Sequence, residues 1–248
     1  MTFCVAMKVE EGLVGIADTR VTSGVEYITA RKVSIHRHGR HSLFLMASGL
    51  RSARDKALTY FEEVLDANGE DFDKLYKAVN ALAEQVRRVA AEDKTALAES
   101  GLFFNLFSIV GGRLANDREH KLYMLYPQGN WVEVGRGTPY YLIGESSYGK
   151  PLLDRALSYE SSMRTALKLG YLAFDATRTA ATDVDFPLDI VLYRAGSFEM
   201  TCHRYERAEL WPISEWWQEQ LTHLVEEMPQ EWIDRALALL PEPAEDQP

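Results

Sequence analysis

The sequence predicts an α+β fold in which helices cover the outer faces of two β-sheets. Three observations lead to this prediction. Strand-forming runs fill much of the first fifty positions and recur between residues 103 and 143 and between residues 189 and 203. A pair of segments with helical periodicity follows each of the first two strand blocks. Strand blocks that alternate with helix pairs favour two sheets with the helices outside them.

The N-terminal residues predict a β-hairpin. Residues 3–18 (FCVAMKVEEGLVGIAD) contain two strand-like runs that are separated by the turn EEG. Because a hairpin returns the end of its second strand to the start of its first, we expect Asp18 close to Thr2. A third strand over residues 32–36 would begin at Lys32, beside the hairpin.

The remaining elements follow from hydrophobic spacing. Helices are predicted over residues 52–68, 72–90, 151–157 and 161–173. Strands are predicted over residues 103–110, 121–126, 131–134, 140–143, 189–193 and 199–203. Turns that contain glycine or asparagine separate many of these segments.

The whole chain is predicted to form one domain over residues 1–240, because 248 residues that are 46% hydrophobic can bury a large core. Within it, residues 214–240 would form a C-terminal helical extension that Pro229 interrupts. This extension either packs on its own domain or contacts another subunit, since tryptophans are favoured at interfaces. Residues 241–248 (PEPAEDQP) predict a disordered acidic tail.

Composition excludes several classes of protein. The formal net charge of −10 argues against binding to nucleic acid, which requires a basic surface. The sequence shows no signal peptide and no apolar run long enough to span a membrane. Cys4 and Cys202 lie in strand-like segments and are expected to be buried free thiols of a reducing compartment. These features predict a cytoplasmic protein with no membrane contact.

Three closely spaced histidines, His36, His38 and His41, raise the question of a metal site. Their spacing does not ensure that they converge on a strand and turn, and the neighbouring Arg37 and Arg40 disfavour a cation. We therefore expect a structural or surface role for these histidines, with neither a metal nor a cofactor.

Thr2 is the strongest candidate for a catalytic residue. Removal of Met1 would place a hydroxyl nucleophile and a free α-amine on this one residue. A terminal amine can act as the base for a threonine hydroxyl, and its pKa of about 7.7–8.0 falls further beside a cation such as Lys32. Asp18 would hold that ammonium in place. Each residue alone also fits an ordinary surface or terminal role.

Several motifs together resemble the β-subunits of the proteasome family of N-terminal nucleophile hydrolases, and most closely the bacterial Anbu (ancestral β-subunit) proteins. The resemblance extends over roughly residues 2–204. The motifs that carry it are Thr2, DTRVT at 18–22, Lys32, ASG at 47–49, GESSYGKP at 144–151 and FPLD at 186–189. It implies that the two sheets and their helices form a four-layer αββα sandwich.

The same resemblance implies a role for each matching residue. Thr2 corresponds to the nucleophile, Asp18 and Lys32 to its activating pair, and the backbone N–H of Gly49 to the oxyanion donor. Ser147 resembles a serine near the terminal amine, although Glu145 replaces the first serine of that family pattern.

One further position, Asp183, is a candidate for the aspartate that completes the hydrogen-bond network around the terminal amine. The segment TDVD at 182–185 does not match the family pattern cleanly.

Two functions follow from the resemblance. The first is a self-exposed threonine hydrolase that cleaves peptide or amide bonds. The second is a weakly active or silent assembly subunit, and another amide-hydrolysing N-terminal nucleophile family remains a third reading. Either way the resemblance implies a homo-oligomer, as a ring or an open helical ring. The sequence has no recognisable ATPase segment, so processing of folded substrates would need a separate ATP-dependent partner. The resemblance also implies an ATP-grasp-like partner.

Overall fold

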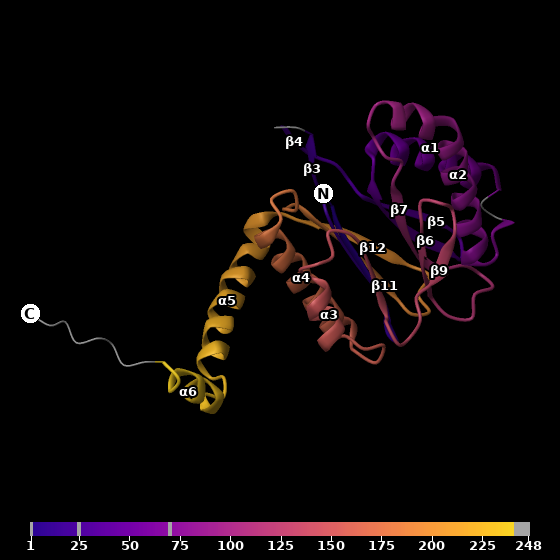
Figure 1. The fold of residues 1–248 in the computed structure, drawn as a ribbon. Helices are drawn as coiled ribbons and strands as arrows, with labels where there is room; N and C mark the ends of the chain where they lie inside the picture. Colours follow the sequence, from indigo (N-terminus) through magenta and orange to yellow (C-terminus); the bar gives the residue numbers. More distant parts are fainter. Residues whose placement is uncertain (1, 24–25, 69–70, 241–248) are drawn as a thin grey trace, which may run out of the picture. The chain divides into compact units, whose positions relative to one another are not determined.

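The computed structural model describes residues 2–23, 26–68 and 71–240 (Figure 1). The predicted tail at 241–248 and the predicted removal of Met1 concern residues outside these ranges. Contacts divide the chain into two compact units, Met1–Arg207 and Ala208–Pro248. The prediction of one domain over residues 1–240 therefore stays a prediction, and each unit is described by itself.

Unit 1 contains two five-stranded antiparallel sheets. The strands of the first sheet, in spatial order, are β10 (Tyr140–Gly144), β1 (Phe3–Val9), β2 (Gly12–Asp18), β11 (Leu188–Arg194) and β12 (Met200–Tyr205). Those of the second are β5 (Val33–His38), β6 (His41–Gly49), β7 (Leu106–Arg113), β8 (Lys121–Leu125) and β9 (Trp131–Glu133). The predicted hairpin of β1 and β2 is confirmed, with Cys4 opposite Ala17.

Helices cover both outer faces of the paired sheets, as Figure 1 shows. The helices α1 (Arg51–Asn68) and α2 (Leu75–Glu99) lie on the second sheet, and α3 (Lys150–Ala156) and α4 (Met163–Ala180) lie on the side of the first sheet. The predicted four-layer αββα sandwich is confirmed. All four helices lie where predicted, although α2 continues to Glu99 instead of ending at residue 90 and α4 continues to Ala180 instead of ending at residue 173.

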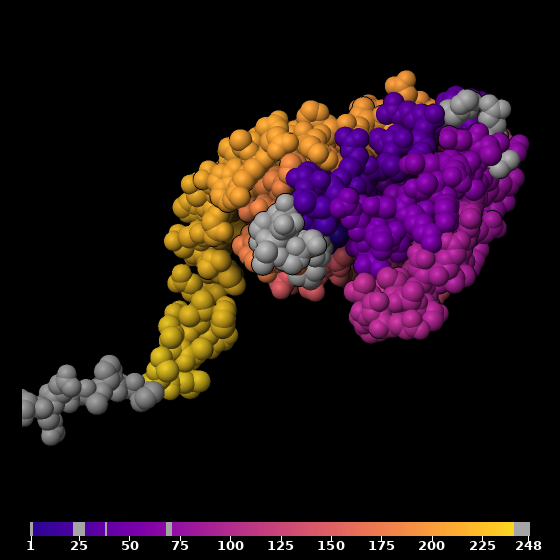
Figure 2. Space-filling view, turned by 90° about the horizontal axis from the view of Figure 1, so that it is seen from above, coloured from indigo at the N-terminus to yellow at the C-terminus, as the bar shows by residue number. Residues whose placement is uncertain are grey.

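The central strands are buried on both faces. Every residue of β1 and β2 is buried, because one face contacts α4 and the other packs against the second sheet. This double burial explains why both strands are nearly continuous apolar runs without polar alternation. In Figure 2 the N-terminal part of the chain (indigo) borders the purple segments that contain β6 and α1. The predicted site residues thus lie at the ends of well-packed strands.

The strand predicted to lie beside the hairpin belongs to the other sheet. β5 forms at Val33 as expected, but it pairs with β6 in the second sheet. The reason is that β1 already pairs with β10 and β2, and β2 already pairs with β1 and β11, so the hairpin has no free edge. A short hairpin that the sequence did not predict, β3 (Arg20–Ser23) with β4 (Glu26–Thr29), follows β2 instead.

The two cysteines differ in environment. Cys4 is buried as predicted, whereas Cys202 is exposed, and both are free thiols. The prediction of two buried thiols was therefore wrong for Cys202, which lies on the edge strand β12 at an outward position. Among the described helices, none is both long and apolar enough to cross a membrane.

Unit 2 is helical in the part that the structure describes. The helix α5 (Arg207–Glu226) and the shorter α6 (Glu231–Leu237) are separated by a break that includes Pro229, as the sequence predicted. Much of the apolar surface of these helices is exposed to solvent. The exposed apolar side chains are Ile213, Trp216, Leu221, Leu224, Val225, Met228, Trp232, Leu237, Leu239 and Leu240.

One buried histidine makes the stability of unit 1 depend on pH. His120 is buried, and its Nε2 donates to Val9 O at 2.8 Å. Burial lowers the pKa of this imidazole. Below about pH 6.5 the unfolded chain therefore binds more protons than the folded chain, so stability is retained above that pH and lost as the pH falls.

We expect His120→Gln to reduce the loss of stability between about pH 7.5 and about pH 5. Each unit of difference between the folded and unfolded pKa corresponds to about 1.4 kcal/mol. Urea denaturation of both proteins at the two pH values measures the effect. His36, whose pKa burial also lowers, retains part of the pH dependence, and equal losses in both proteins would contradict the assignment to His120.

Candidate active site

Asp18 is the centre of the candidate site. It ends β2, and its side chain is fully buried. Its Oδ1 accepts two hydrogen bonds, from Lys32 Nζ at 2.6 Å and from the backbone N–H of Phe3 at 2.8 Å. Because Phe3 is bonded directly to Thr2, one carboxylate oxygen connects the buried ammonium to the residue next to the predicted nucleophile. The structure thus brings Thr2, Asp18 and Lys32 together.

Lys32 reaches this carboxylate from the second sheet. It precedes β5, its carbonyl accepts from Ala47 N at 3.2 Å, and its side chain is almost completely buried. Its Nζ also donates to Arg20 O at 2.7 Å. The Lys32 ammonium, which comes from the side of the second sheet, is therefore held by two oxygens, Asp18 Oδ1 and Arg20 O. An ammonium held in this way is a fixed positive charge beside the chain terminus.

Burial and charge act in opposite directions in this site. Burial raises the pKa of the Asp18 carboxyl, and the nearby Lys32 ammonium opposes that rise. Burial also raises the pKa of the Cys4 thiol to about 12. Cys4 therefore stays protonated at neutral pH and does not act as a competing nucleophile, since the thiolate is the reactive form.

The backbone of Thr2 is held from the side of β10. Thr2 O accepts from Glu145 N at 2.7 Å, and Phe3 pairs with Gly144. Gly144 has a φ of +86°, and a Cβ at this position would lie 1.9 Å from Thr2 O. Only glycine allows this approach, so its place as the last residue of β10 helps to position Thr2. Thr2 itself is half-buried.

The N–H of Gly49 points away from its neighbouring strand β7, and its role as an oxyanion donor stays a prediction. Leu50 N–H donates to Asn105 O at 3.0 Å, so the alternation of an antiparallel pair directs the N–H of Gly49 away from β7. It points toward the side of β5, which begins only at Val33 and does not extend to this position. Lys32 lies on that side, because its carbonyl accepts from the N–H of Ala47, two residues before Gly49 in β6.

Replacing Gly49 by alanine is expected to destabilise the protein by about 1–3 kcal/mol. Gly49 has a φ of +135°, and an added Cβ would lie 1.9 Å from Asn105 O. Gly39→Ala is the matched control, because Gly39 also has a positive φ of +53° but has nothing within 4 Å of an added Cβ. Thermal unfolding of both variants separates the clash from the cost of a positive φ. Equal destabilisation would show that the contact with Asn105 is unimportant.

Ser147 and Asp183 have less decisive positions. Ser147 is exposed in the loop between β10 and α3, and its N–H donates to the Glu145 carboxylate at 2.9 Å. Glu145, which departs from the family pattern, thus closes a turn with Ser147. Asp183 is half-buried in the segment between α4 and β11. The roles of both residues stay predictions.

Two supporting contacts of the site were not predicted as such. Thr19 donates through its N–H and its hydroxyl to Pro187 O, at 3.0 and 2.8 Å. Arg20 forms a 3.0 Å ion pair with Asp185. Both contacts join the DTRVT and FPLD regions, and they support the backbone that carries Asp18 and the carbonyl bound by Lys32. The presence of both motifs in the sequence was the available signal, whereas their contact required the fold.

A metal site is not apparent in the described part of the chain. Among those residues, no group of three or more His, Cys, Asp or Glu side chains is arranged to hold a metal ion. His36 instead lies 3.1 Å from the Ser34 hydroxyl.

The arrangement of sheets and helices closely matches solved structures. Anbu from Pseudomonas aeruginosa, described as a helical assembly, has a TM-score of 0.85 and 29% identity over 92% of this chain and 97% of its own. Anbu from Yersinia bercovieri has a TM-score of 0.82 and 28% identity over 92% of this chain and 97% of its own. Anbu from Hyphomicrobium sp. strain MC1 gives 0.82 and 28%, over 92% and 98%. The chain thus has the fold of the Anbu proteins and is similar to them over most of its length.

The similarity to Anbu proteins rests on three-dimensional structure. No family model matches the chain, and no curated protein sequence matches it significantly. Nearly the whole length of each solved Anbu chain is matched, so the proteasome-like sandwich is shared as a complete unit.

Proposed function

We propose that this Anbu-type chain is an N-terminal threonine hydrolase that cleaves peptide or amide bonds through an acyl-enzyme. The observation that carries the proposal is the shared oxygen of Asp18, which binds both Lys32 Nζ and the N–H of Phe3. This contact places Phe3, the residue that follows Thr2, beside a buried cation. The similarity to Anbu structures adds support, since proteasome-type subunits are N-terminal nucleophile hydrolases.

In the first half of the reaction, Thr2 is the N-terminal residue of the mature chain. Its neutral α-amine accepts the proton of its own hydroxyl as Oγ1 attacks the substrate carbonyl. The nearby Lys32 ammonium lowers the pKa of that amine and so increases its neutral fraction. The N–H of Gly49 donates to the tetrahedral oxyanion. Collapse of this intermediate transfers the proton to the departing amine and leaves an ester on Thr2.

Water completes the reaction by hydrolysing the ester. The α-amine of Thr2 takes a proton from the water as the oxygen attacks, the same donor stabilises the second oxyanion, and the proton returns to Oγ1 as the acid product leaves. The chemistry needs no group beyond the chain and water. Ser147 and Asp183 would help to orient the amine.

The alternative is an Anbu-type assembly subunit with little or no hydrolytic activity. The observation that favours it is the Glu145 carboxylate, which accepts from the N–H of Ser147 in the loop that follows β10. A carboxylate near the terminal amine would stabilise its protonated form and weaken it as a base.

Intact-mass spectrometry with a β-lactone or epoxyketone probe distinguishes the two functions. Loss of the mass of one methionine, followed by one probe adduct that peptide mapping places on Thr2, is the result expected of a hydrolase. A chain that retains Met1, or a free Thr2 that never reacts, would exclude the proposed activity in the purified protein and favour the assembly subunit.

The proposed working form is a homo-oligomer, either a ring or an open helical ring. Two observations support it: one of the similar Anbu structures is described as a helical assembly, and unit 2 exposes many large apolar side chains. Exposed apolar patches of this kind are typical of protein interfaces. A cytoplasmic location and a separate ATP-dependent or ATP-grasp-like partner belong to the same proposal.

We expect the double variant Leu224→Glu/Trp232→Glu to dissociate the assembly. Both side chains are more than half exposed in unit 2, and truncation of a central apolar contact costs about 2–4 kcal/mol of association. Gln218→Glu, which adds charge at an exposed polar position of α5, is the control. Sedimentation velocity should show smaller particles for the double variant alone. Unchanged particles would place the subunit contacts elsewhere.

A further inference from the structure

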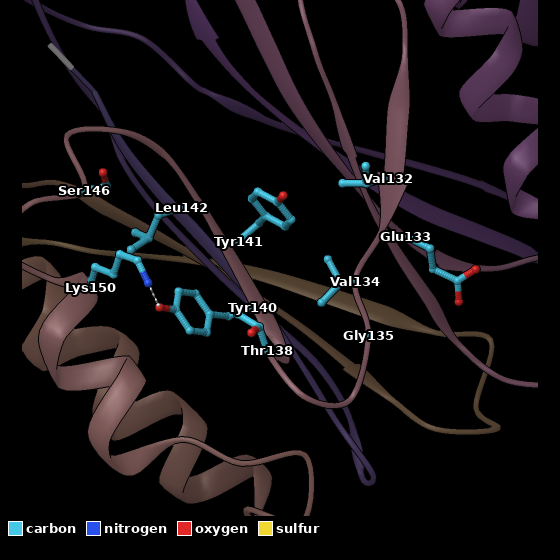
Figure 3. Close-up of a pocket in the computed structure, with 10 residues that line it drawn as sticks. All are labelled: Val132, Glu133, Val134, Gly135, Thr138, Tyr140, Tyr141, Leu142, Ser146 and Lys150. Atoms are coloured by element: carbon cyan, nitrogen blue, oxygen red, sulfur yellow. Dashed lines mark hydrogen bonds between the residues drawn. The ribbon is translucent and has the colours of Figure 1, made fainter.

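A hollow of about 620 Å³ lies between β9 and β10, apart from the candidate active site (Figure 3). β9 is an edge strand of the second sheet, and β10 is an edge strand of the first. Edges of both sheets thus border one cavity, which Thr2, Asp18 and Lys32 do not line. An uncovered strand edge presents backbone N–H and C=O groups that can pair with another chain.

The bonds to β1 identify which groups of β10 remain available. Lys8 N donates to Pro139 O at 2.7 Å, and Ala6 lies opposite Tyr141 in the same antiparallel register. Positions two residues apart face the same neighbour, so Tyr141 also directs its backbone groups toward β1. Tyr140 and Leu142 occupy the alternate positions. Their N–H and C=O groups therefore point away from β1, on the edge that borders the hollow.

The two sides of the hollow differ in polarity. In Figure 3 the side chains of Val132 and Val134 point toward β10, on the side of Tyr141, whereas Glu133 points away. On the other side, Lys150 lies 3.1 Å from the Tyr140 hydroxyl. One side is therefore largely apolar and the other is polar.

Lys150 does not give the hollow a free positive charge. Its Nζ is 2.7 Å from the Asp154 carboxylate. The polar side thus offers hydrogen-bonding groups with a balanced charge, which favours an uncharged polar ligand group over an anion.

We propose that this hollow binds an extended peptide with alternating apolar and polar side chains, which adds to the edge of β10 as a further strand. The outward groups of Tyr140 and Leu142 have the spacing that a peptide backbone requires. The apolar side chains would face Val132 and Val134, and the polar ones would face Lys150. The volume is that of a small-ligand pocket. It suits a few residues of one strand, and it is too small for the packed face of another subunit.

Binding there would extend the sheet that carries the candidate nucleophile. β10 lies between the hollow and β1, and it continues through Gly144 into Glu145, whose N–H holds Thr2 O. The site is separate from the catalytic residues, so the proposal stands whether or not the chain is a hydrolase.

The probe for this site is a fluorescent, end-blocked hexapeptide of alternating valine and threonine, titrated into the full-length protein. Two matched controls carry N-methyl groups on the valines alone or on the threonines alone. Alternate residues of a strand face opposite edges, so only one methylated peptide should lose affinity, by about tenfold or more. Loss of affinity in both peptides or in neither, or no binding of the parent peptide, would overturn the proposal.

Hydrogen exchange locates the bound peptide. Saturation with the hexapeptide should slow exchange at the amides of Tyr140 and Leu142. Leu142→Pro removes an N–H that does not bond β1, a change that an edge strand tolerates, and it should weaken binding while the circular dichroism spectrum stays unchanged.

Two other exchange patterns would contradict the proposal. Protection confined to the region of Gly49 would place the peptide in the candidate active site. Protection of β10 that rises with protein concentration in the absence of peptide would show that a second copy of the chain covers this edge.

Discussion

Thr2→Ala is expected to abolish probe labelling and to reduce peptide or amide hydrolysis by about a thousandfold or more, because it removes the attacking oxygen. The fold should be unaffected. The contact that positions this residue uses the backbone carbonyl of Thr2, which accepts from Glu145 N at 2.7 Å, and alanine retains that carbonyl. Intact-mass spectrometry after incubation with the probe, together with thermal unfolding, measures both properties.

Thr2→Ser is the matched control for this variant. Serine retains the hydroxyl and the α-amine and loses only the methyl group, so labelling should persist. Both variants also keep a small residue after Met1, so removal of Met1 should be equally efficient. Labelling of the alanine variant at the rate of the unaltered protein would show that another residue is the nucleophile.

Lys32→Met should destabilise unit 1 by about 3–5 kcal/mol and also abolish activity. The substitution leaves the fully buried Asp18 carboxylate without its ammonium partner, and an unpaired buried charge is costly. The effect should be severe because Oδ2 of Asp18 has no hydrogen-bond partner among the described residues. Urea denaturation measures the loss of stability, and the covalent probe measures the loss of reactivity.

A double-mutant cycle separates the two roles of Lys32. Adding Asp18→Asn to Lys32→Met removes the unpaired charge and leaves an amide oxygen that still accepts from Phe3 N–H. The double variant should therefore recover much of the stability while remaining inactive. If its stability equalled that of Lys32→Met, the ion pair would not explain the loss. If it regained activity, Lys32 would have no part in activating the terminal amine.

The sequence predicted secondary structure correctly where the spacing of apolar residues reflects the burial of the segment. The apolar runs of β1 and β2 around the turn at residues 10–12 predicted their hairpin, because both faces of these strands are covered. The helical spacing after residue 50 predicted α1 and α2, because one face of each helix is buried against the core. Patterns of this kind depend on each segment's own surroundings and are visible before the chain folds.

The sequence did not predict features that depend on neighbours distant along the chain, such as the order of strands in a sheet. It placed the strand after Lys32 beside the hairpin, but β1 and β2 already have both neighbours, and β5 joins the other sheet. It also took Cys202 as buried, although β12 is an edge strand. Nothing in either segment states which strands flank it, because edge and central positions are properties of the assembled sheet.

The candidate site combines both kinds of information. The sequence by itself determined the residue types: a small second residue, Asp18 at the end of a strand, Lys32, and a glycine at position 49. Only the tertiary structure decided that Lys32 approaches Asp18 from the opposite sheet, to 2.6 Å, and that the N–H of Gly49 points to the same side. The physical reason is that packing two sheets face to face determines such distances, and no segment contains the other sheet.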